Sequence, residues 1–280
     1  MDTIMRTTAD GAPGGDARDG DLLDLMVAFR ARREPHALAT VVETSGSTSA
    51  MPGSKALIDG AGRVVAGWVG GGCAESMTCQ AAVDAMGDGR PRMIDLDMDD
   101  EVLGTGMPCG GTMRVFVEPV LPKPTLWILG HGRVAECISR FGAQLGFRIV
   151  VNDTPLAERA KFPDAAEIVT DDPGYDRLTP GPADCVVVAT QHKGDHLSTV
   201  RALRSAVGQI AVIASRKRAR LVLDFLRQEG FSDADIARVR APAGLDLGGR
   251  APEEVALSVV AEIMMLRHRA SGRSKREGPP

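Results

Sequence analysis

The sequence of 280 residues has few aromatic side chains and no strong excess of charge of either sign. Phe, Trp and Tyr make up 4% of the chain, and 33 basic residues stand against 37 acidic ones, for a net charge of −4. Nucleic-acid binding relies on basic surfaces and on aromatic rings that stack on bases. We therefore expect no nucleic-acid partner.

The sequence also lacks long apolar runs. None approaches the ~18 residues of a membrane span, and the N-terminus has no basic stretch followed by an apolar one, as a secretory signal would. We expect a cytoplasmic protein with no membrane span. In that compartment its five cysteines would be reduced, and an odd number at low density does not predict a disulfide framework.

Composition divides the chain into two expected domains. Residues 1–19 and 271–280 are rich in small and polar residues without apolar periodicity, which predicts disordered tails. Residues 119–124 contain three prolines and are predicted to form a stiff linker. The N-terminal domain then spans residues 20–118 and the C-terminal domain residues 125–270.

The N-terminal domain is expected to be a small α/β unit. Apolar residues at helical spacing, Leu22, Leu25, Met26 and Phe29, predict a first helix, and a second is expected between Cys73 and residue 86. Strands are expected at residues 38–43, 55–58, 64–69, 92–96 and 112–117. A turn at residues 59–62 would join the second and third of these strands as a hairpin.

The C-terminal domain is predicted to be a Rossmann-like, doubly wound parallel sheet. Its expected strands, at residues 125–129, 147–151, 184–190 and 209–214, are apolar runs without polar alternation. Runs of this kind are typical of parallel strands buried on both faces. Helical segments alternate with them, which favours parallel pairing with helical crossovers.

A glycine-rich turn follows the first of these strands. Gly130-x-Gly132-x-x-Ala135 lies between a strand and a helix, and Asp153 follows about 20 residues later, as in dinucleotide-binding folds. The turn would bind phosphate and Asp153 a ribose hydroxyl; the alternative is a sheet that kept the turn and lost the ligand. We assign no role to His131, which lies within the turn.

Two cysteines lie in glycine-rich segments, Cys73 after Gly71 and Gly72, and Cys109 before Gly110. Glycine lets a ligand approach the backbone closely, and a helix N-terminus favours the thiolate form. Thiolates are soft ligands for metals and suit sulfur transfer. The alternatives are two tight turns with Cys73 as a small filler. The other three cysteines, Cys79, Cys137 and Cys185, are expected in the core.

Polar residues also follow the later strands of the expected sheet. Asp195 and Arg216 would lie at its ligand-binding edge, where Arg216 could contact phosphate, although Asp195 could instead cap a helix. His192 and His196 share a helical spacing that resembles a metal pair, but no third ligand is evident. We therefore favour a ligand-facing loop there over a metal site.

Taken together, the motifs resemble the XdhC/CoxI family, the accessory proteins of xanthine dehydrogenase and carbon monoxide dehydrogenase. The resemblance runs from about residue 20 to 268 and rests on an ordered set of segments. These are Pro52-Gly53, Gly71-Gly72-Cys73-x-Glu75, Gly106-Met107-x-Cys109-Gly110-Gly111, Gly130-x-Gly132-x-Val134, Thr190-Gln191, Asp195, Ser215-Arg216-Lys217, the segment 242–248, Pro252-Glu253-Glu254 with residues 255–258, and Ala261-Glu262-Ile263.

The resemblance implies a maturation factor that binds the molybdenum pyranopterin cofactor, with or without a cytosine nucleotide, and supports its sulfuration. It would deliver the cofactor to the large subunit of a molybdenum hydroxylase and work with a cysteine desulfurase. By position, Gly71, Gly72, Cys73, Glu75, Cys109 and Gly110 become candidates for the cofactor, with Cys73 and Cys109 at the metal. Gly130, Gly132 and Asp153 become candidates for its nucleotide end, and Asp195 and Arg216 are further candidates for binding the cofactor.

Three other functions remain open. An NAD(P)-dependent oxidoreductase would use the Gly130 turn but leaves the cysteine segments unexplained. A sulfurtransferase carrying persulfide on Cys73 or Cys109 explains the thiols but not the nucleotide fold. A structural protein without a ligand would tolerate loss of both thiols. A stoichiometric factor fits better than a turnover enzyme, and the sequence leaves homo-oligomerisation open.

Overall fold

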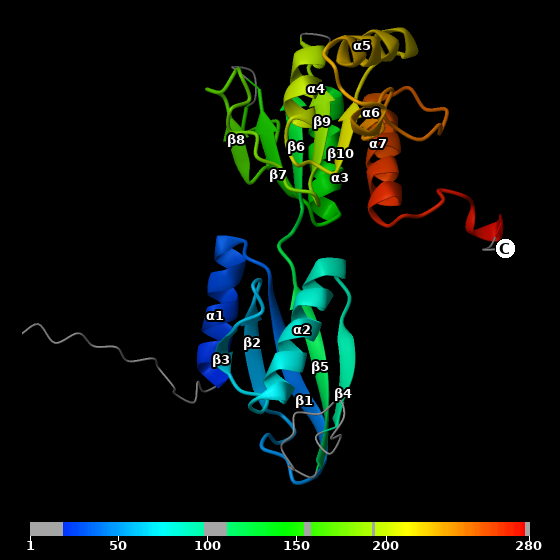
Figure 1. Ribbon diagram of the computed structural model, residues 1–280. Coiled ribbons are helices and arrows are strands. Elements are labelled where there is room, and N and C mark those ends of the chain that lie inside the picture. Colours follow the sequence, from blue (N-terminus) through cyan, green and yellow to red (C-terminus); the bar gives the residue numbers. More distant parts are fainter. Residues whose placement is uncertain (1–18, 98–110, 154–157, 192–193, 278–280) are drawn as a thin grey trace, which may run out of the picture. The chain divides into compact units, whose positions relative to one another are not determined.

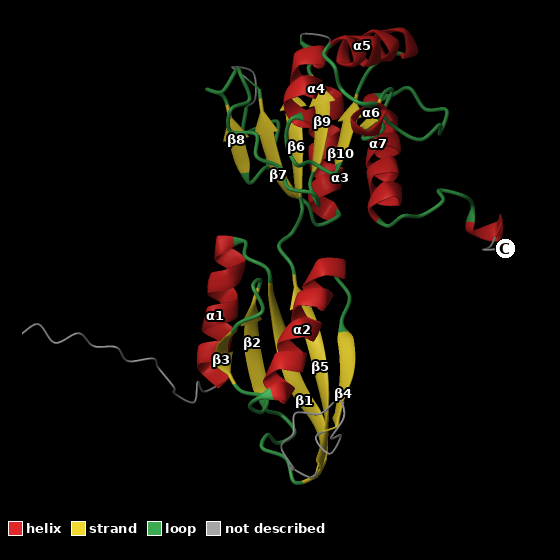
Figure 2. Ribbon diagram, in the orientation of Figure 1, coloured by secondary structure: helices red, strands yellow, loops and turns green. Residues whose placement is uncertain are grey.

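The computed structural model describes residues 19–97, 111–153, 158–191 and 194–277. The chain divides into two compact units, Met1–Pro122 and Lys123–Pro280. Figures 1 and 2 show the helices and strands of each unit. Cys109, Gly110 and His192 lie outside the described residues, as do residues 1–18 of the first predicted tail and residues 278–280 of the second.

The N-terminal unit contains an antiparallel sheet in the order β3-β2-β1-β5-β4. The strands are β1 (His36–Gly46), β2 (Lys55–Asp59), β3 (Val64–Gly67), β4 (Arg92–Asp97) and β5 (Gly111–Val120). Its helices are α1 (Asp19–Arg32) and α2 (Cys73–Asp88). The predicted hairpin is confirmed, since β2 pairs with β3 across the turn at residues 60–63.

Helix α2 covers one face of this sheet through small side chains. Ala81, Ala82 and Ala85 pack against a cluster that includes Val41 and Val115. Side chains of this size let the helix backbone approach the sheet closely. Helix α1 lies against strand β2 through a separate small cluster, Leu22, Phe29 and Leu57.

The segment between the two units begins later than the predicted linker. Strand β5 continues through Val120 and pairs Pro119 with Ala37, so the stretch without secondary structure begins at Leu121. A proline is tolerated there because the pairing of β5 with β4 ends at Val117, which leaves Pro119 with a single neighbouring strand.

The C-terminal unit is the predicted doubly wound sheet, in the order β11-β10-β9-β6-β7-β8. All neighbouring strands are parallel. The strands are β6 (Thr125–Gly130), β7 (Arg148–Asn152), β8 (Glu167–Val169), β9 (Cys185–Ala189), β10 (Gln209–Val212) and β11 (Val239–Arg240). The helices are α3 (Arg133–Gln144), α4 (Asp195–Leu203), α5 (Arg216–Gln228), α6 (Asp233–Ile236) and α7 (Pro252–Arg267), followed by the 3-10 turn η1 (Lys275–Glu277).

Each face of this sheet carries its own hydrophobic cluster. Successive residues of β6 point to opposite faces, so Ile128 packs with α3 and α7, whereas Leu129 packs with α4 and α5. This explains why the strands are uninterrupted apolar runs in the sequence. Among the helices that the structure describes, none is long and apolar enough to span a membrane.

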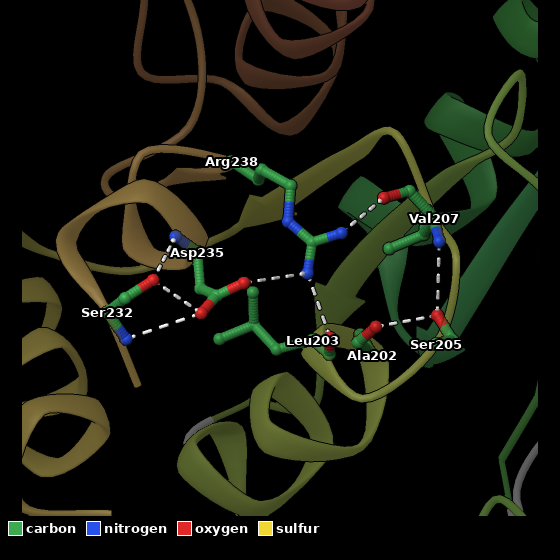
Figure 3. A network of polar contacts seen from close by, with 7 residues as sticks. All are labelled: Ala202, Leu203, Ser205, Val207, Ser232, Asp235 and Arg238. Atoms are coloured by element: carbon green, nitrogen blue, oxygen red, sulfur yellow. Dashed lines mark hydrogen bonds and ion pairs between the residues drawn. The ribbon is translucent and has the colours of Figure 1, made fainter. Parts of the chain in front are cut away.

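A network of polar contacts lies at the amino edge of the sheet (Figure 3). The Arg238 guanidinium donates to the carbonyl oxygens of Leu203, at 2.8 Å, and Val207, at 3.0 Å. Asp235 lies 3.8 Å from the same guanidinium and accepts from Ser232 in the capping box of α6. The network joins the end of α4 to the starts of β10 and β11.

Candidate functional site

The C-terminal unit has a topological switch point between β6 and β9. These neighbouring parallel strands are followed by helices on opposite faces, since α3 packs into one hydrophobic cluster and α4 into the other. In open α/β sheets the crevice at the carboxyl ends of two such strands is where ligands bind. The sequence placed Gly130, Gly132 and Asp153 at this edge, and the structure brings them there.

A cavity of about 250 Å³ opens at this point. Its walls are residues 131–134 of the β6–α3 turn and the start of α3, Ala189 at the end of β9, Gln191 after β9, and Ile213 after β10. Because three strand ends contribute to it, the cavity is a product of the sheet topology and not of one loop.

Glycine is favoured at both positions of the turn, at Gly130 by close backbone neighbours and at Gly132 by a positive φ. Gly130 has a φ of +123°, and a Cβ there would lie 2.2 Å from the Ala189 carbonyl oxygen. Gly132 has a φ of +92°, and a Cβ there would lie 2.4 Å from Nε2 of Gln191. Gly132 is also the N-cap of α3, and it offers no side chain to the helix amides. The first-turn amides of α3 therefore remain available to an anion.

Asp153 follows β7 directly, and its Oδ2 contacts Nδ1 of His131. The two side chains are mostly buried, with 16% and 22% of their surfaces exposed. A ribose hydroxyl at Asp153 would share the carboxylate with the His131 ring. The contact between His131 and Asp153 was not predicted from the sequence. The glycine fingerprint could have indicated it, because the residue between the two glycines lies close to the acid that follows the second strand.

Asp195 is the first residue of α4 and is completely buried. Its carboxylate accepts hydrogen bonds from the Thr190 hydroxyl and from Nε of Arg218, the latter at 3.1 Å. It therefore faces the protein interior beside the cavity. His196 packs edge-on against Phe225 at 4.7 Å between ring centroids.

Arg216 begins α5 and is exposed to solvent. Ser215 precedes it as the N-cap, where its hydroxyl accepts from the amide of Arg218. The side chain of Arg216 thus lies at the carboxyl edge of the sheet, after β10, where the sequence predicted a phosphate contact. It is not part of the wall of the 250 Å³ cavity.

In the N-terminal unit, Cys73 is the first residue of α2 and is partly exposed. Gly71 and Gly72 before it are exposed, and a Cβ on either would meet nothing within 4 Å. Gly72 is the N-cap and offers no side chain to the helix amides. Glu75 lies in the first turn of α2 and is also partly exposed.

The strand that follows Cys109 begins near this turn. A Cβ on Gly70 would lie 3.5 Å from Cε of Met113, which is on β5. The first residue of β5, Gly111, approaches the carbonyl oxygens of Ser45 and Ser47, both 2.7 Å from a Cβ placed there. The start of α2 and the start of β5 therefore lie at one end of the unit (Figure 1).

The remaining cysteines differ from Cys73 in burial. Cys137 and Cys185 are buried, as predicted, and burial raises the pKa of both thiols. Cys79 is only half-buried, and burial followed by the charge of Glu75 raises the pKa of its thiol. These three groups are therefore protonated thiols at neutral pH. Among the described residues, no group of three or more His, Cys, Asp or Glu side chains could hold a metal ion.

The N-terminal unit also has a cavity, of about 340 Å³, which lies at the sheet face opposite α2. Arg114 on β5 forms ion pairs there with Asp95 on β4, at 2.6 Å, and Glu43 on β1, at 3.2 Å. No sequence pattern indicates this cavity, because it depends on the register of three strands.

The parallel sheet, its strand order and the glycine turn at the switch point define a Rossmann-type unit, here joined to an antiparallel α/β unit. The models that match are the XdhC Rossmann domain over residues 126–263 and the XdhC and CoxI family over residues 29–97. The chain belongs to the XdhC and CoxI family.

Three curated relatives are similar to this chain. YqeB of Escherichia coli (strain K12) is 30% identical over 244 residues, which are 85% of this chain and 44% of that protein. A probable xanthine dehydrogenase subunit of Bacillus subtilis (strain 168) is 29% identical over 165 residues, 57% of this chain and 48% of that protein. The molybdenum cofactor insertion chaperone PaoD of E. coli (strain K12) is 25% identical over 265 residues, 82% of this chain and 83% of that protein. The chain thus spans less than half the length of the first two relatives.

Proposed function

We propose that this chain is a maturation factor that binds the molybdenum pyranopterin cofactor, protects it, supports its sulfuration and delivers it to the large subunit of a molybdenum hydroxylase. Membership of the XdhC and CoxI family supports this role. The similarity to PaoD, named a molybdenum cofactor insertion chaperone, supports it further, because it extends over most of both chains.

The observation that carries the proposal is the cavity at the β6/β9 switch point. The cofactor is a phosphorylated pterin, so a site for it needs anion donors that do not depend on side chains already in use. The uncapped first turn of α3 supplies such amides, at a turn where Gly132 leaves the backbone accessible. Asp153 would accept from a ribose hydroxyl if the cofactor carries a nucleotide, and exposed Arg216 would attract its phosphates.

The molybdenum end of the cofactor is assigned to the glycine-framed thiols. Cys73 is partly exposed at a helix N-terminus whose approach, Gly71 and Gly72, is open. A thiolate there is a soft ligand. Cys109 and Gly110 remain part of the proposal from the sequence. Release of the cofactor to a hydroxylase would be stoichiometric, and a cysteine desulfurase would supply the sulfur.

The test is to purify the full chain from a host that makes the molybdenum cofactor. Molybdenum is measured by mass spectrometry, and pterin by fluorescence after oxidation. Cys73→Ala and Cys109→Ala are compared with Cys79→Ala, a thiol on the same helix as Cys73 with no proposed contact. We expect stoichiometric molybdenum and pterin in wild type and in Cys79→Ala, with loss of molybdenum in one or both of the other variants.

Absence of both molybdenum and pterin from wild type, under conditions where a known carrier retains them, would contradict the proposal. Saturable NAD(P)H binding with turnover would then favour the oxidoreductase. A persulfide trapped on Cys73 or Cys109 without pterin would favour the sulfurtransferase.

A further inference from the structure

The Asp195 carboxylate does not line the nucleotide cavity, yet it contacts two segments that border it. One partner is Thr190, which lies between cavity residues Ala189 and Gln191. The other is Arg218 in the first turn of α5, the helix that follows cavity residue Ile213 after β10. A single carboxylate therefore joins the end of β9 to the starts of α4 and α5.

Burial makes these contacts obligatory. Asp195 exposes none of its surface and Thr190 only 6%. A carboxylate removed from water must be hydrogen-bonded and charge-compensated, and loss of one partner leaves a buried group unsatisfied. The side chains of Thr190 and Arg218 are thus held where Asp195 requires them.

The residue next to Thr190 has an unusual backbone. Gln191 has a φ of +52°, a value that non-glycine residues seldom adopt. Such a conformation persists when its neighbours fix it, and it is frequent at ligand sites. In this conformation the Gln191 side chain lies against Gly132, since its Nε2 is 2.4 Å from where a Cβ on that glycine would be.

We propose that Asp195 is a positioning residue. Through Thr190 it fixes the end of β9, and through Arg218 it ties that end to α5, so that the Gln191 amide is held in the wall of the cavity and can hydrogen-bond a nucleotide. The sequence predicted Asp195 as a direct contact, whereas here it acts through its neighbours. The choice of a nucleotide as ligand rests on the proposed function; the positioning itself does not.

The structure supplies a matched control in the network of Figure 3. Asp235 and Arg238 repeat the pairing of Asp and Arg in the same unit, but at the amino edge of the sheet. A variant there perturbs a polar network of similar composition without touching the cavity. Asp235→Asn therefore separates a general loss of stability from a local change at the strand ends.

The experiment uses the full chain with two measurements. Hydrogen exchange reports on the backbone at residues 189–191, and calorimetric titration with CDP and with ADP gives the Kd for each probe. The variants are Asp195→Asn, Thr190→Val, Thr190→Ser, Arg218→Gln, the Thr190→Val/Arg218→Gln double variant and Asp235→Asn. Thr190→Ser keeps the hydroxyl and is the conservative rescue.

We expect Asp195→Asn and Thr190→Val to speed exchange at residues 189–191 and to weaken probe binding by about tenfold, the loss typical of one misplaced hydrogen bond. Thr190→Ser should behave as wild type. The double variant should lose less than the sum of its single changes, because both act through one carboxylate. Asp235→Asn should lower Tm and leave both readouts unchanged.

Wild-type exchange at residues 189–191 in Thr190→Val and Arg218→Gln would overturn the inference, even if Asp195→Asn fails to fold. So would equal changes in Asp235→Asn. If wild type binds neither probe, the nucleotide assignment of the cavity fails, and the exchange data alone decide whether Asp195 positions the strand end.

Discussion

The two glycine turns of this chain precede helices in the same way and have opposite surroundings. At the β6–α3 turn, a Cβ on Gly130 or Gly132 would strike a neighbour at 2.4 Å or less. Before α2, a Cβ on Gly71 or Gly72 would meet nothing within 4 Å. Close neighbours thus restrict the β6–α3 turn, whereas the turn before α2 has open space on its described sides.

The two turns are the ones proposed to bind opposite ends of the cofactor, its nucleotide at the β6–α3 turn and its molybdenum at Cys73. The crowded turn is part of a sheet crevice and is formed before any ligand arrives. The open turn presents Cys73, which is partly exposed, at the start of α2. Substitutions should therefore act mainly through stability at the first turn and mainly through binding at the second.

Each unit carries one of the two tryptophans, which makes the comparison measurable. Trp68 lies in the N-terminal unit and is 44% exposed, whereas Trp127 lies in β6 and is 8% exposed. Fluorescence of Trp127→Phe and Trp68→Phe backgrounds during urea unfolding then reports on one unit at a time.

The largest effect is expected for Gly130→Ala. The substitution strains a φ of +123° and pushes Cβ into the Ala189 carbonyl oxygen, a backbone atom that cannot turn away. Strain and overpacking together predict a loss of about 3 kcal/mol or more in the free energy of unfolding, read from Trp127. Gly146→Ala is the control, because its φ of +84° is strained but its surroundings are empty. Equal losses in both variants would show that crowding at the turn is unimportant.

Gly111→Ala tests whether the start of β5, at the same end of the N-terminal unit as Cys73, has open space like that beside Gly71. Its Cβ would lie 2.7 Å from two carbonyl oxygens, those of Ser45 and Ser47. We expect a loss of about 1–3 kcal/mol in the transition reported by Trp68, and no change in that reported by Trp127. No loss at all would mean that the backbone around Gly111 yields easily, and that Gly111 is not a rigid counterpart to Gly130.

The sequence predicted much of the C-terminal unit because its physics is local. Uninterrupted apolar runs identify β6, β7, β9 and β10, and the parallel order follows from the alternation with helices. The strands β8 and β11 went unpredicted, because they have three and two residues and show no periodicity. The linker was predicted to start too early, at Pro119, because the sequence does not show which neighbours a strand has, and its tolerance for proline depends on them.

The site was predictable in its backbone and less so in its side chains. The glycine pattern predicted the turn between β6 and α3, since strand, turn and helix are contiguous in the chain. The contact of His131 with Asp153 and the burial of Asp195 depend on how distant segments meet. Arg218, 23 residues from Asp195, has no sequence signal that joins it to that carboxylate.

A smaller effect, with a pH dependence, is expected at one carboxylate in each unit. Burial acts to raise the pKa of Asp59 and of Asp172, but hydrogen bonds outweigh it and both pKa values are lowered. At Asp59 the donors are Arg63 and the Ala61 amide, and at Asp172 they are the amides of Arg177 and Asp176 with the Asn152 side chain.

A lowered folded-state pKa stabilises the unit above the unfolded value of about 4, and the benefit is lost as the pH falls through the folded pKa. Asp59→Asn should thus cost about 1 kcal/mol at pH 7, with the deficit shrinking below about pH 4, in the Trp68 transition alone. Asp172→Asn should do the same in the Trp127 transition. A deficit that stays constant down to acid pH would mean that the charge of the carboxylate contributes nothing.

The smallest effect on stability, and the most telling for function, is expected for Gly71→Ala. Its φ lies outside the positive range and a Cβ there has open space, so the change should alter the free energy of unfolding by less than about 0.5 kcal/mol. If the turn is open because the cofactor occupies that space, the same methyl group should lower the molybdenum content of the purified protein. The control is Ser76→Ala, which lies one turn into α2 and is exposed. Unchanged molybdenum in both variants would mean that the space beside Gly71 is ordinary solvent, and the functional contrast between the two turns would disappear.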